Sequence, residues 1–128
     1  MRGIRGRPAH AIVATRDLDA ALAFYSGTLG LTVIENDAYG CFLEAAGTEV
    51  RLSVVEGFEP AGLPVLGWLV PDVAATVAAL AAAGVPTVRV AGLGQDDAGI
   101  WTGPDGARLA WFQDPDGNLL SMVEDTRR

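Results

Sequence analysis

The 128-residue sequence has no lysine, one cysteine, one histidine and no long apolar run, and each shortage excludes a class of function. All nine basic residues are arginine, so Schiff-base chemistry and a lysine general base are excluded. Cys41 has no second thiol with which to form a disulfide, a CxxC pair or a thiolate zinc cluster. No stretch approaches the roughly 20 apolar residues that span a membrane. We therefore expect a cytoplasmic protein without a membrane-spanning part.

Basic residues are also few relative to acidic ones. Sixteen Asp and Glu residues against nine Arg give a formal net charge of −7 and a pI of about 4.4. Such a chain repels phosphate backbones and anionic lipid surfaces, which excludes nucleic acid and membranes as partners. The length fits a single domain, residues 1–128, that buries a core without help from a metal or a disulfide.

The sequence contains the same order of elements twice, in modules of about residues 8–58 and 63–124. In the first module an apolar strand leads to Asp17, a residue suited to cap a helix that ends at Gly27 or Gly30. In the second, Asp72 and Gly84 bound a helix in the same way. Three strands are predicted after each helix: 31–37, 39–45 and 49–56 in the first module, and three drawn from 85–90, a short piece near 99–102, 107–113 and 119–124 in the second.

This pattern predicts an α+β fold of tandem βαβββ modules, which align without gaps through their first strand and helix at an offset of 55 residues. The segment 91–106 is rich in Gly and Asp, and we expect it to be irregular and mobile. The DPDGN sequence at 114–118 is predicted to form the hairpin turn between the last two strands.

Three motifs carry a resemblance to a known family. His10 stands seven residues before Asp17, FY-x3-LG follows at 24–30, and DPDGN precedes the last strand. Together with the tandem βαβββ pattern, these resemble the vicinal oxygen chelate superfamily, which includes glyoxalase I, extradiol dioxygenases and bleomycin-resistance proteins. The resemblance spans residues 9–124 and implies an open, cup-like mixed sheet with flanking helices, usually in a homodimer.

The resemblance also implies where a metal would bind. Enzymes of the family hold a divalent ion through two histidines and one or two carboxylates on the first and last strands of the modules. The matching positions are His10, Val65, Ser121, and Arg51 or a neighbour. Valine cannot ligate, and one imidazole with one hydroxyl falls short of the roughly three protein ligands that catalytic sites need. We therefore predict no metal and no other cofactor.

Two alternatives would keep a divalent metal. A shifted register would bring the carboxylate of Glu49 or of Glu124 into the cup, and two subunits could share their single histidines. Both depend on ligands outside the positions that the family uses.

Strand alternation places His10 and Val65 on the cup-facing side of their strands. His10 is either a hydrogen-bond donor or general base, or an edge residue that backbone carbonyls or water satisfy. Arg51 either forks onto a ligand carboxylate or enolate oxygen, or forms a surface pair with Glu44 or Glu49.

The three tryptophans receive different predictions. Trp68 alternates with the residues of its strand that should face the cup, so its side chain should point toward the helices. We predict that Trp68 lies in the core. Trp111 is predicted to face the cup, where it would contact a ligand. Trp101, in the Gly- and Asp-rich segment, covers a ligand, a partner subunit or its own domain.

These observations favour a metal-independent small-molecule-binding protein of the glyoxalase/bleomycin-resistance type, which binds an aromatic or natural-product ligand. The expected ligand contacts are His10, Arg51, Val65, Trp101, Trp111 and Ser121. The alternative is a lyase, isomerase or dioxygenase with an unusual metal site, or with metal-free acid–base chemistry in which His10 and Arg51 are catalytic. A third class, an interaction module that docks through Trp101, also remains open.

Overall fold

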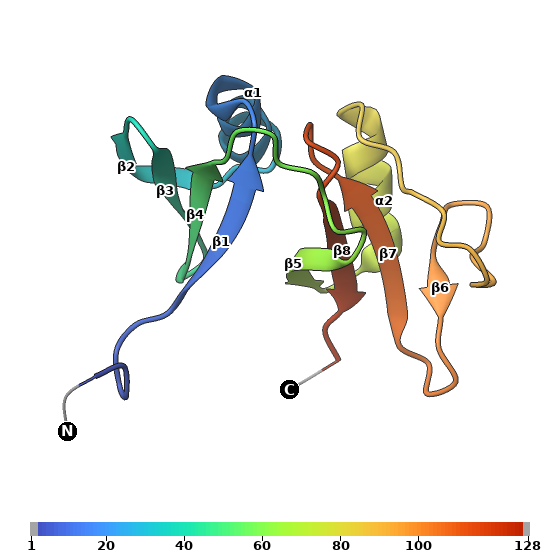
Figure 1. The fold of residues 1–128 in the computed structure, drawn as a ribbon. Coiled ribbons are helices and arrows are strands. Elements are labelled where there is room, and N and C mark those ends of the chain that lie inside the picture. The colour runs from blue at the N-terminus through green and yellow to red at the C-terminus, as the bar shows by residue number, and fades with distance from the viewer. Residues whose placement is uncertain (1–2, 127–128) are drawn as a thin grey trace. The chain divides into compact units, whose positions relative to one another are not determined.

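The computed structural model describes residues 3–126, and the chain divides into two units, the first ending at Phe58 and the second beginning at Glu59. Each unit has one four-stranded mixed sheet with a helix against one of its faces (Figure 1). The predicted α+β architecture with flanking helices is confirmed. Among the described residues, no helix combines the length and apolar character needed to cross a membrane.

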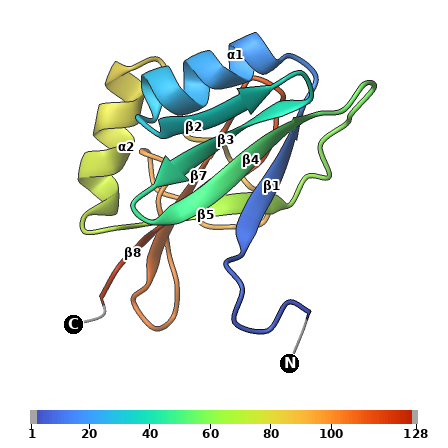
Figure 2. The same ribbon diagram turned by 90° about the vertical axis from the view of Figure 1, so that its left-hand side faces the viewer.

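The first unit contains a mixed sheet in the order β1-β4-β3-β2. Strand β1 is parallel to β4, whereas β4, β3 and β2 pair antiparallel, as Figure 2 shows from the side of this unit. Its elements are β1 (His10–Thr15), α1 (Leu18–Leu22), the π-helical turn η1 (Ala23–Thr28), β2 (Thr32–Asp37), β3 (Gly40–Ala45) and β4 (Thr48–Val54).

The helix of the first unit begins where the sequence predicts. Asp17 is its N-cap, and the Asp17 Oδ1 atom accepts a hydrogen bond of 3.2 Å from the backbone N–H of Ala20. Ala21 and Tyr25 are buried on the face turned to the sheet. Gly30, with φ of +78°, follows η1 in the left-handed conformation that ends helices.

Alternate residues of the first sheet face the helix and form the core. Val13, Leu43, Val50 and Leu52 are all buried, and Cys41 is buried beside them, where desolvation raises the pKa of its thiol. The other side, which we call the open face of the first sheet, is lined by His10, Ile12, Ala14, Thr32, Glu35, Asp37, Gly40, Phe42, Glu44, Glu49, Arg51 and Ser53.

The second unit repeats this topology in the order β5-β8-β7-β6, with β5 parallel to β8. Asp72 caps its helix by accepting a 3.1 Å hydrogen bond from the N–H of Ala75, and Gly84 ends it with φ of +84°. Its elements are β5 (Pro64–Val70), α2 (Val73–Ala82), β6 (Trp101–Thr102), β7 (Arg108–Gln113) and β8 (Leu119–Glu124).

The strand predicted at residues 85–90 does not form, and that prediction is wrong. The N–H of Val90 donates to the side-chain Oε1 of Gln95 over 2.7 Å, whereas a strand would pair it with backbone. The Nε2 group of the same Gln95 side chain donates to the backbone carbonyls of Val88 and Gly99. Between α2 and β7, the described chain therefore forms a single strand, β6, of two residues. The irregular segment is fastened by side chains, and opening it would break these bonds.

The turn before β8 is built around one carboxylate. Asp114 Oδ1 accepts hydrogen bonds of 2.9 Å from the N–H groups of Asp116 and Asn118, and Asp114 Oδ2 accepts one of 2.8 Å from the Asn118 amide. All three residues are buried. The structural role predicted for this turn is confirmed.

Candidate functional site

Arg51 lies at the middle of the open face of the first sheet. On β4 it pairs across the sheet with Ile12 of β1 on one side and Phe42 of β3 on the other. Ile12 is 65% exposed although it is large and apolar. This row therefore places an exposed aliphatic side chain, a cation and an aromatic ring side by side, three kinds of contact with different chemistry.

Phe42 connects the two residues that the sequence analysis proposed as catalytic. The Cζ atom of Arg51 lies 4.9 Å from the centroid of the Phe42 ring, within the range of a cation–π interaction. The His10 ring meets the same ring edge-on, with the centroids 5.1 Å apart and the planes at 79°. The structure thus brings His10 and Arg51 to one aromatic side chain.

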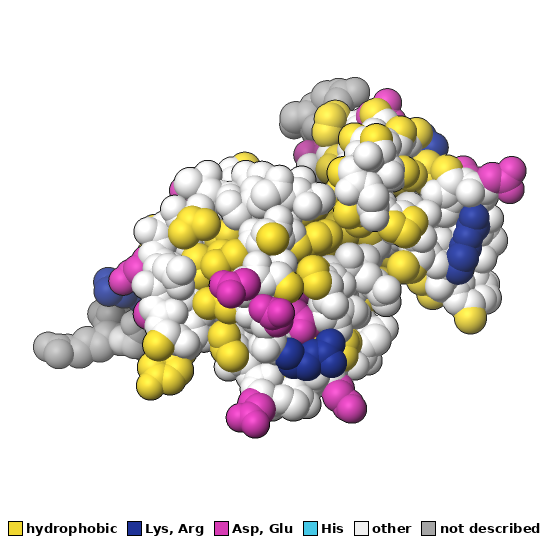
Figure 3. Space-filling view, turned by 90° about the horizontal axis from the view of Figure 1, so that it is seen from above, with side chains coloured by type: hydrophobic (Ala, Val, Ile, Leu, Met, Phe, Trp, Pro, Cys, Tyr) yellow, Lys and Arg dark blue, Asp and Glu magenta, His cyan; other side chains and the backbone are white. Residues whose placement is uncertain are grey.

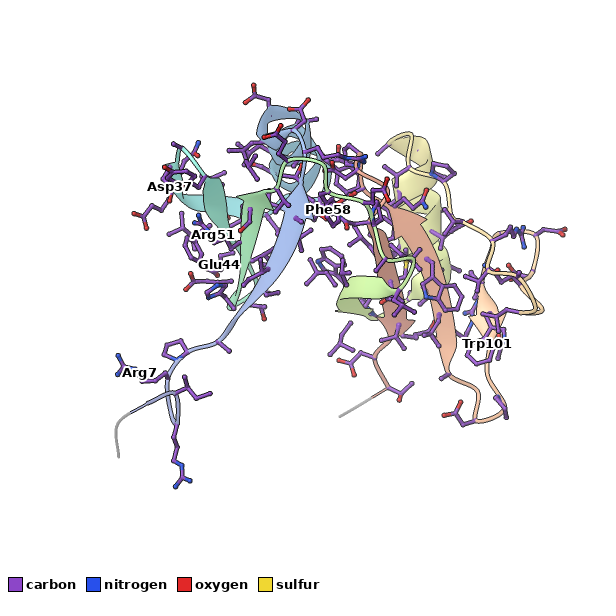
Figure 4. The ribbon with its side chains drawn as sticks, viewed as in Figure 1. Arg7, Asp37, Glu44, Arg51, Phe58 and Trp101 are labelled. Carbon is purple, nitrogen blue, oxygen red and sulfur yellow. The ribbon has the colours of Figure 1, made fainter. Side chains whose placement is uncertain are left out.

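The guanidinium of Arg51 also pairs with a carboxylate that sequence reasoning missed. Asp37 Oδ1 lies 3.5 Å from Arg51 Nη2, and Figure 4 shows the two side chains next to each other. The backbone N–H of Tyr39 donates to this Oδ1 over 2.8 Å and, together with Arg51, holds the pKa of the Asp37 carboxyl below its ordinary value. Neither Glu44 nor Glu49, the partners considered from sequence, forms this pair.

The same three positions recur in the second sheet with different side chains. Gly67 pairs with Ser121, and Ser121 pairs with Trp111, as Ile12, Arg51 and Phe42 do in the first. A Cβ on Gly67 would lie 2.7 Å from Ser121 Oγ, so glycine leaves space for the hydroxyl. In the second sheet, the aromatic residue Trp111 therefore lies beside the hydroxyl of Ser121. In the first sheet, the aromatic residue Phe42 lies beside the cation of Arg51.

No charged residue lies on the strands of the open face of the second sheet, which alternation assigns to Val65, Gly67, Leu69, Trp101, Leu109, Trp111, Gln113, Leu119, Ser121 and Val123. Val65 is 42% and Leu69 56% exposed. Trp111 lies on this face, as its parity predicts, but it is only 8% exposed, so little of its ring can touch a ligand. Apolar side chains reach the surface in several places (Figure 3).

The other two tryptophans pack within their own unit. Trp68 is on the helix side of β5, as predicted, and its ring lies 5.8 Å from that of the buried Phe112, but Trp68 itself is only half-buried and so lies at the margin of the core. The Trp101 ring lies over Gly103, where a Cβ would come within 3.2 Å of it. Trp101 is half-buried, and the contact accounts for part of its cover.

The residues at the family's metal positions do not fit a metal ion. At the equivalent last-strand positions, the open faces carry Arg51 in the first sheet and Ser121 in the second. Strand β5 carries Val65. Glu49 does pair with His10 on the open face of the first sheet, but no group of three His, Cys, Asp or Glu able to hold an ion occurs within residues 3–126.

The second carboxylate that a shifted register could supply is engaged elsewhere. Glu124 has the parity of the buried Leu120 and Met122. Its Oε2 accepts from the N–H of Val73 over 3.2 Å and lies 3.4 Å from Arg108. Glu124 therefore anchors the start of α2 and does not lie on the open face.

Phe42 is the main residue that the sequence analysis missed. It is equivalent to Trp111 by strand pairing, yet the offset between the modules grows from 55 residues at Ile12 and Gly67 to 70 at Arg51 and Ser121. The longer loop of the second unit breaks the gap-free alignment. Mapping strand pairs instead of residue numbers would have found Phe42.

Comparison with known proteins places this geometry in a family. Residues 7–122 match the family model of the Glyoxalase/Bleomycin resistance protein/Dioxygenase superfamily. No protein with a curated function matches the chain. A member of the same superfamily from Sphaerobacter thermophilus is similar in structure, with a TM-score of 0.72 and 25% identity over 92% of this chain and 96% of that one.

Two further solved structures share the fold at lower identity. A bleomycin resistance determinant encoded on the transposon Tn5 has a TM-score of 0.72 and 21% identity, over 93% of this chain and 98% of that one. A lactoylglutathione lyase from Agrobacterium tumefaciens has a TM-score of 0.70 and 18% identity, over 90% of each chain. The family match covers most of the chain, and the protein belongs to the Glyoxalase/Bleomycin resistance protein/Dioxygenase superfamily.

Proposed function

We propose that this protein binds a small aromatic molecule on the open face of its first sheet and needs no metal ion to do so. The observation that carries the proposal is the guanidinium of Arg51 over the Phe42 ring, at the last-strand position where the family resemblance expects a metal ligand. The cation, the ring and the exposed Ile12 offer a molecule charge, stacking and apolar contact within one cross-strand row.

The same cation disfavours a metal. A divalent ion about 5 Å from a guanidinium would be repelled by roughly 7 kcal/mol at an effective dielectric constant of about 20. Asp37 offsets part of this repulsion, but it is half-exposed and already accepts a hydrogen bond from Tyr39. The sequence has no second histidine that could supply a further imidazole ligand and compensate.

The relatives include both kinds of function. One similar structure is a bleomycin resistance determinant and another a lactoylglutathione lyase. The fold is compatible with either, so the side chains of this chain must decide. Its charge-free second face, with Val65, Leu69 and Ser121, supports binding by apolar contact more than it supports chemistry.

A second candidate, metal-free acid–base catalysis, has one observation in its favour. His10 and Arg51 both contact the Phe42 ring, so a base and an oxyanion-stabilising cation could act on one substrate. In this version the protein would convert a ligand after metal has been stripped, and His10→Ala would abolish conversion. If His10 serves binding alone, His10→Ala weakens binding and no wild-type turnover is detected.

The proposal is tested by titrating a panel of small aromatic molecules into ¹⁵N-labelled protein that has been treated with a chelator. We expect saturable shifts of the backbone amide signals of His10, Phe42 and Arg51. Phe42→Ala should remove them by taking away the ring that both neighbours contact. Tyr39→Ala is the matched control, because Tyr39 is an aromatic residue that is 77% exposed on the β2–β3 turn.

Two outcomes would contradict the proposal. One is saturation only after a divalent ion is added. The other is binding that survives Phe42→Ala unchanged but falls with Tyr39→Ala, which would move the contact away from the open face.

We also propose that the protein forms a homodimer. The support is the exposure of large apolar side chains such as Leu63 and Leu69, which a monomer leaves in water. Sedimentation velocity over a hundredfold range of concentration should give twice the 13.3 kDa chain mass. A single-chain mass throughout would contradict the dimer without affecting the ligand proposal.

A further inference from the structure

Neighbouring residues fix the position of the Arg51 guanidinium in its ion pair with Asp37. A Cβ on Gly40 would lie 3.2 Å from Arg51 Nη2, so the glycine leaves the guanidinium its place above the strand. The Phe42 ring lies beneath it. The Arg51 side chain is 20% exposed, and the Asp37 side chain 50%. The cation is therefore fixed in position and still reachable from solvent.

The pair is nevertheless weak in geometry. The Nη2–Oδ1 distance of 3.5 Å exceeds the roughly 2.7–2.9 Å of a charge-assisted hydrogen bond. The same Oδ1 receives the N–H of Tyr39 at 2.8 Å, so the β2–β3 turn holds Asp37 independently of the arginine. A guanidinium has five N–H donors, and Asp37 is the one acceptor that approaches it among the described residues.

We propose that the aromatic ligand carries a carboxylate or a similar oxyanion that binds Arg51, and that Asp37 holds the guanidinium in place until the ligand displaces it. This inference rests on the proposed function and specifies the ligand class. The oxyanion would take the unused donors of Arg51, while the ring of the ligand lies over the exposed Ile12, the cross-strand partner of Arg51.

The acidic neighbours of Arg51 limit the strength of this binding. Glu35, Glu44 and Glu49 lie on the same open face and oppose an anion. All three are exposed, and charges in water are screened over a Debye length of about 8 Å at physiological salt. The direct contact with a partly buried guanidinium is screened less. We therefore expect a moderate preference for anions, which depends on this one residue.

The test compares two probes with the same ring system and nearly the same size, the anionic 1-naphthoate and the neutral 1-naphthamide. Each is titrated at pH 7 into chelator-treated protein, and the dissociation constant is taken from the amide shifts of Phe42 and Arg51. We expect the acid to bind roughly tenfold more tightly than the amide. Arg51→Met should abolish this preference by weakening the acid alone.

Asp37→Asn tests the placeholder role and keeps Arg51 intact. Asparagine Oδ1 can still accept from Tyr39 but no longer competes as a charge, so the acid should bind about two- to threefold more tightly and the amide unchanged. If Arg51→Met fails to fold, Asp37→Asn still tests the inference by itself. Arg108→Met is the matched control, because Arg108 also pairs with a carboxylate, that of Glu124, and its loss should leave the preference unchanged.

The outcomes separate the two proposals. Equal binding of acid and amide, or an acid preference that survives Arg51→Met, would overturn this inference and leave aromatic binding in place. Unchanged acid binding in Asp37→Asn would overturn the placeholder role. Binding of neither probe would contradict the proposed function and this inference with it.

Discussion

Arg51 and Ser121 occupy the same position in the two sheets of one chain. Arg51 pairs with Ile12 on the parallel first strand of its sheet, and Ser121 pairs with Gly67, which lies 55 residues after Ile12. One module thus presents a cation and the other a hydroxyl where the family resemblance expects a ligand for a metal. The two sheets share their topology but differ in the side chains at these two positions.

Gly40 should tolerate no side chain. A Cβ there would overlap the carbonyl oxygen of Leu52 and crowd Arg51 Nη2, so Gly40→Ala should lower the free energy of unfolding by about 1–3 kcal/mol. Urea denaturation measures the change. Gly27→Ala is the control, because nothing lies within 4 Å of its Cβ in η1, and it should stabilise by about 0.5–1 kcal/mol. Equal effects of the two would contradict the close contact at Gly40.

Asp72→Ala should remove the N-cap of α2. Asp72 Oδ1 accepts from the N–H of Ala75, and losing a cap costs about 1 kcal/mol. The free energy of unfolding is compared with that of Asp97→Ala, an exposed aspartate whose carbonyl, not its carboxylate, accepts the hydrogen bond from Arg89. We expect Asp97→Ala to stay within about 0.5 kcal/mol of wild type. A cap variant as stable as this control would show that the bond contributes nothing.

Asp114→Ala should lower the free energy of unfolding more than Asp72→Ala does. Removal of its carboxylate leaves the buried N–H groups of Asp116 and Asn118 and the Asn118 amide without their acceptor. We expect a loss of about 2–4 kcal/mol in the free energy of unfolding. Asp105→Ala, in an exposed turn with one such bond to Ala107, should cost less than about 1 kcal/mol. Similar costs for both would argue against a special role of the turn.

Asp37 should make stability depend on pH in the acid range. The Tyr39 N–H and Arg51 lower its native pKa below the ordinary 3.8, so the ionised carboxylate favours the folded state above that pH. The contribution is lost as pH falls through the native pKa. The stability difference between wild type and Asp37→Asn should be constant from pH 5 to 7 and shrink below 3.8. A difference that grows on acidification would contradict this sign.

The sequence was sufficient for the parts of the fold that depend on local chemistry. The caps Asp17 and Asp72 and the turn carboxylate Asp114 act through hydrogen bonds within a few residues, so their spacing identified them. Residues 85–90 make one backbone hydrogen bond to β7, from the N–H of Val88 to the carbonyl of Trp111, but form no strand because the Gln95 side-chain amide bonds to the N–H of Val90 and the carbonyl of Val88. A β-prone run cannot reveal that its hydrogen-bond partner is a side chain.

The candidate site was only partly predictable for a related reason. Strand alternation predicted that His10 and Trp111 lie on the open faces, and the family resemblance placed Arg51 there by its match with Ser121; the strand pairing agrees. It could not show that Trp111 would be nearly buried, nor that Phe42 would be the ring shared by His10 and Arg51. Asp37 was missed because its contact with Arg51 reaches across an intervening strand, β3, and depends on the missing side chain of Gly40.

Metal-independent binding, the central claim, is tested most directly by native mass spectrometry. Tag-free protein is exposed in turn to Zn²⁺, Ni²⁺, Mn²⁺ and Fe²⁺, exchanged into volatile buffer, and weighed with and without 1-naphthoate. The account predicts chains that retain no ion and bind the probe equally well after every treatment, because Arg51, Val65 and Ser121 replace the ligands. One tightly held ion per chain that is required for the probe to bind would contradict it.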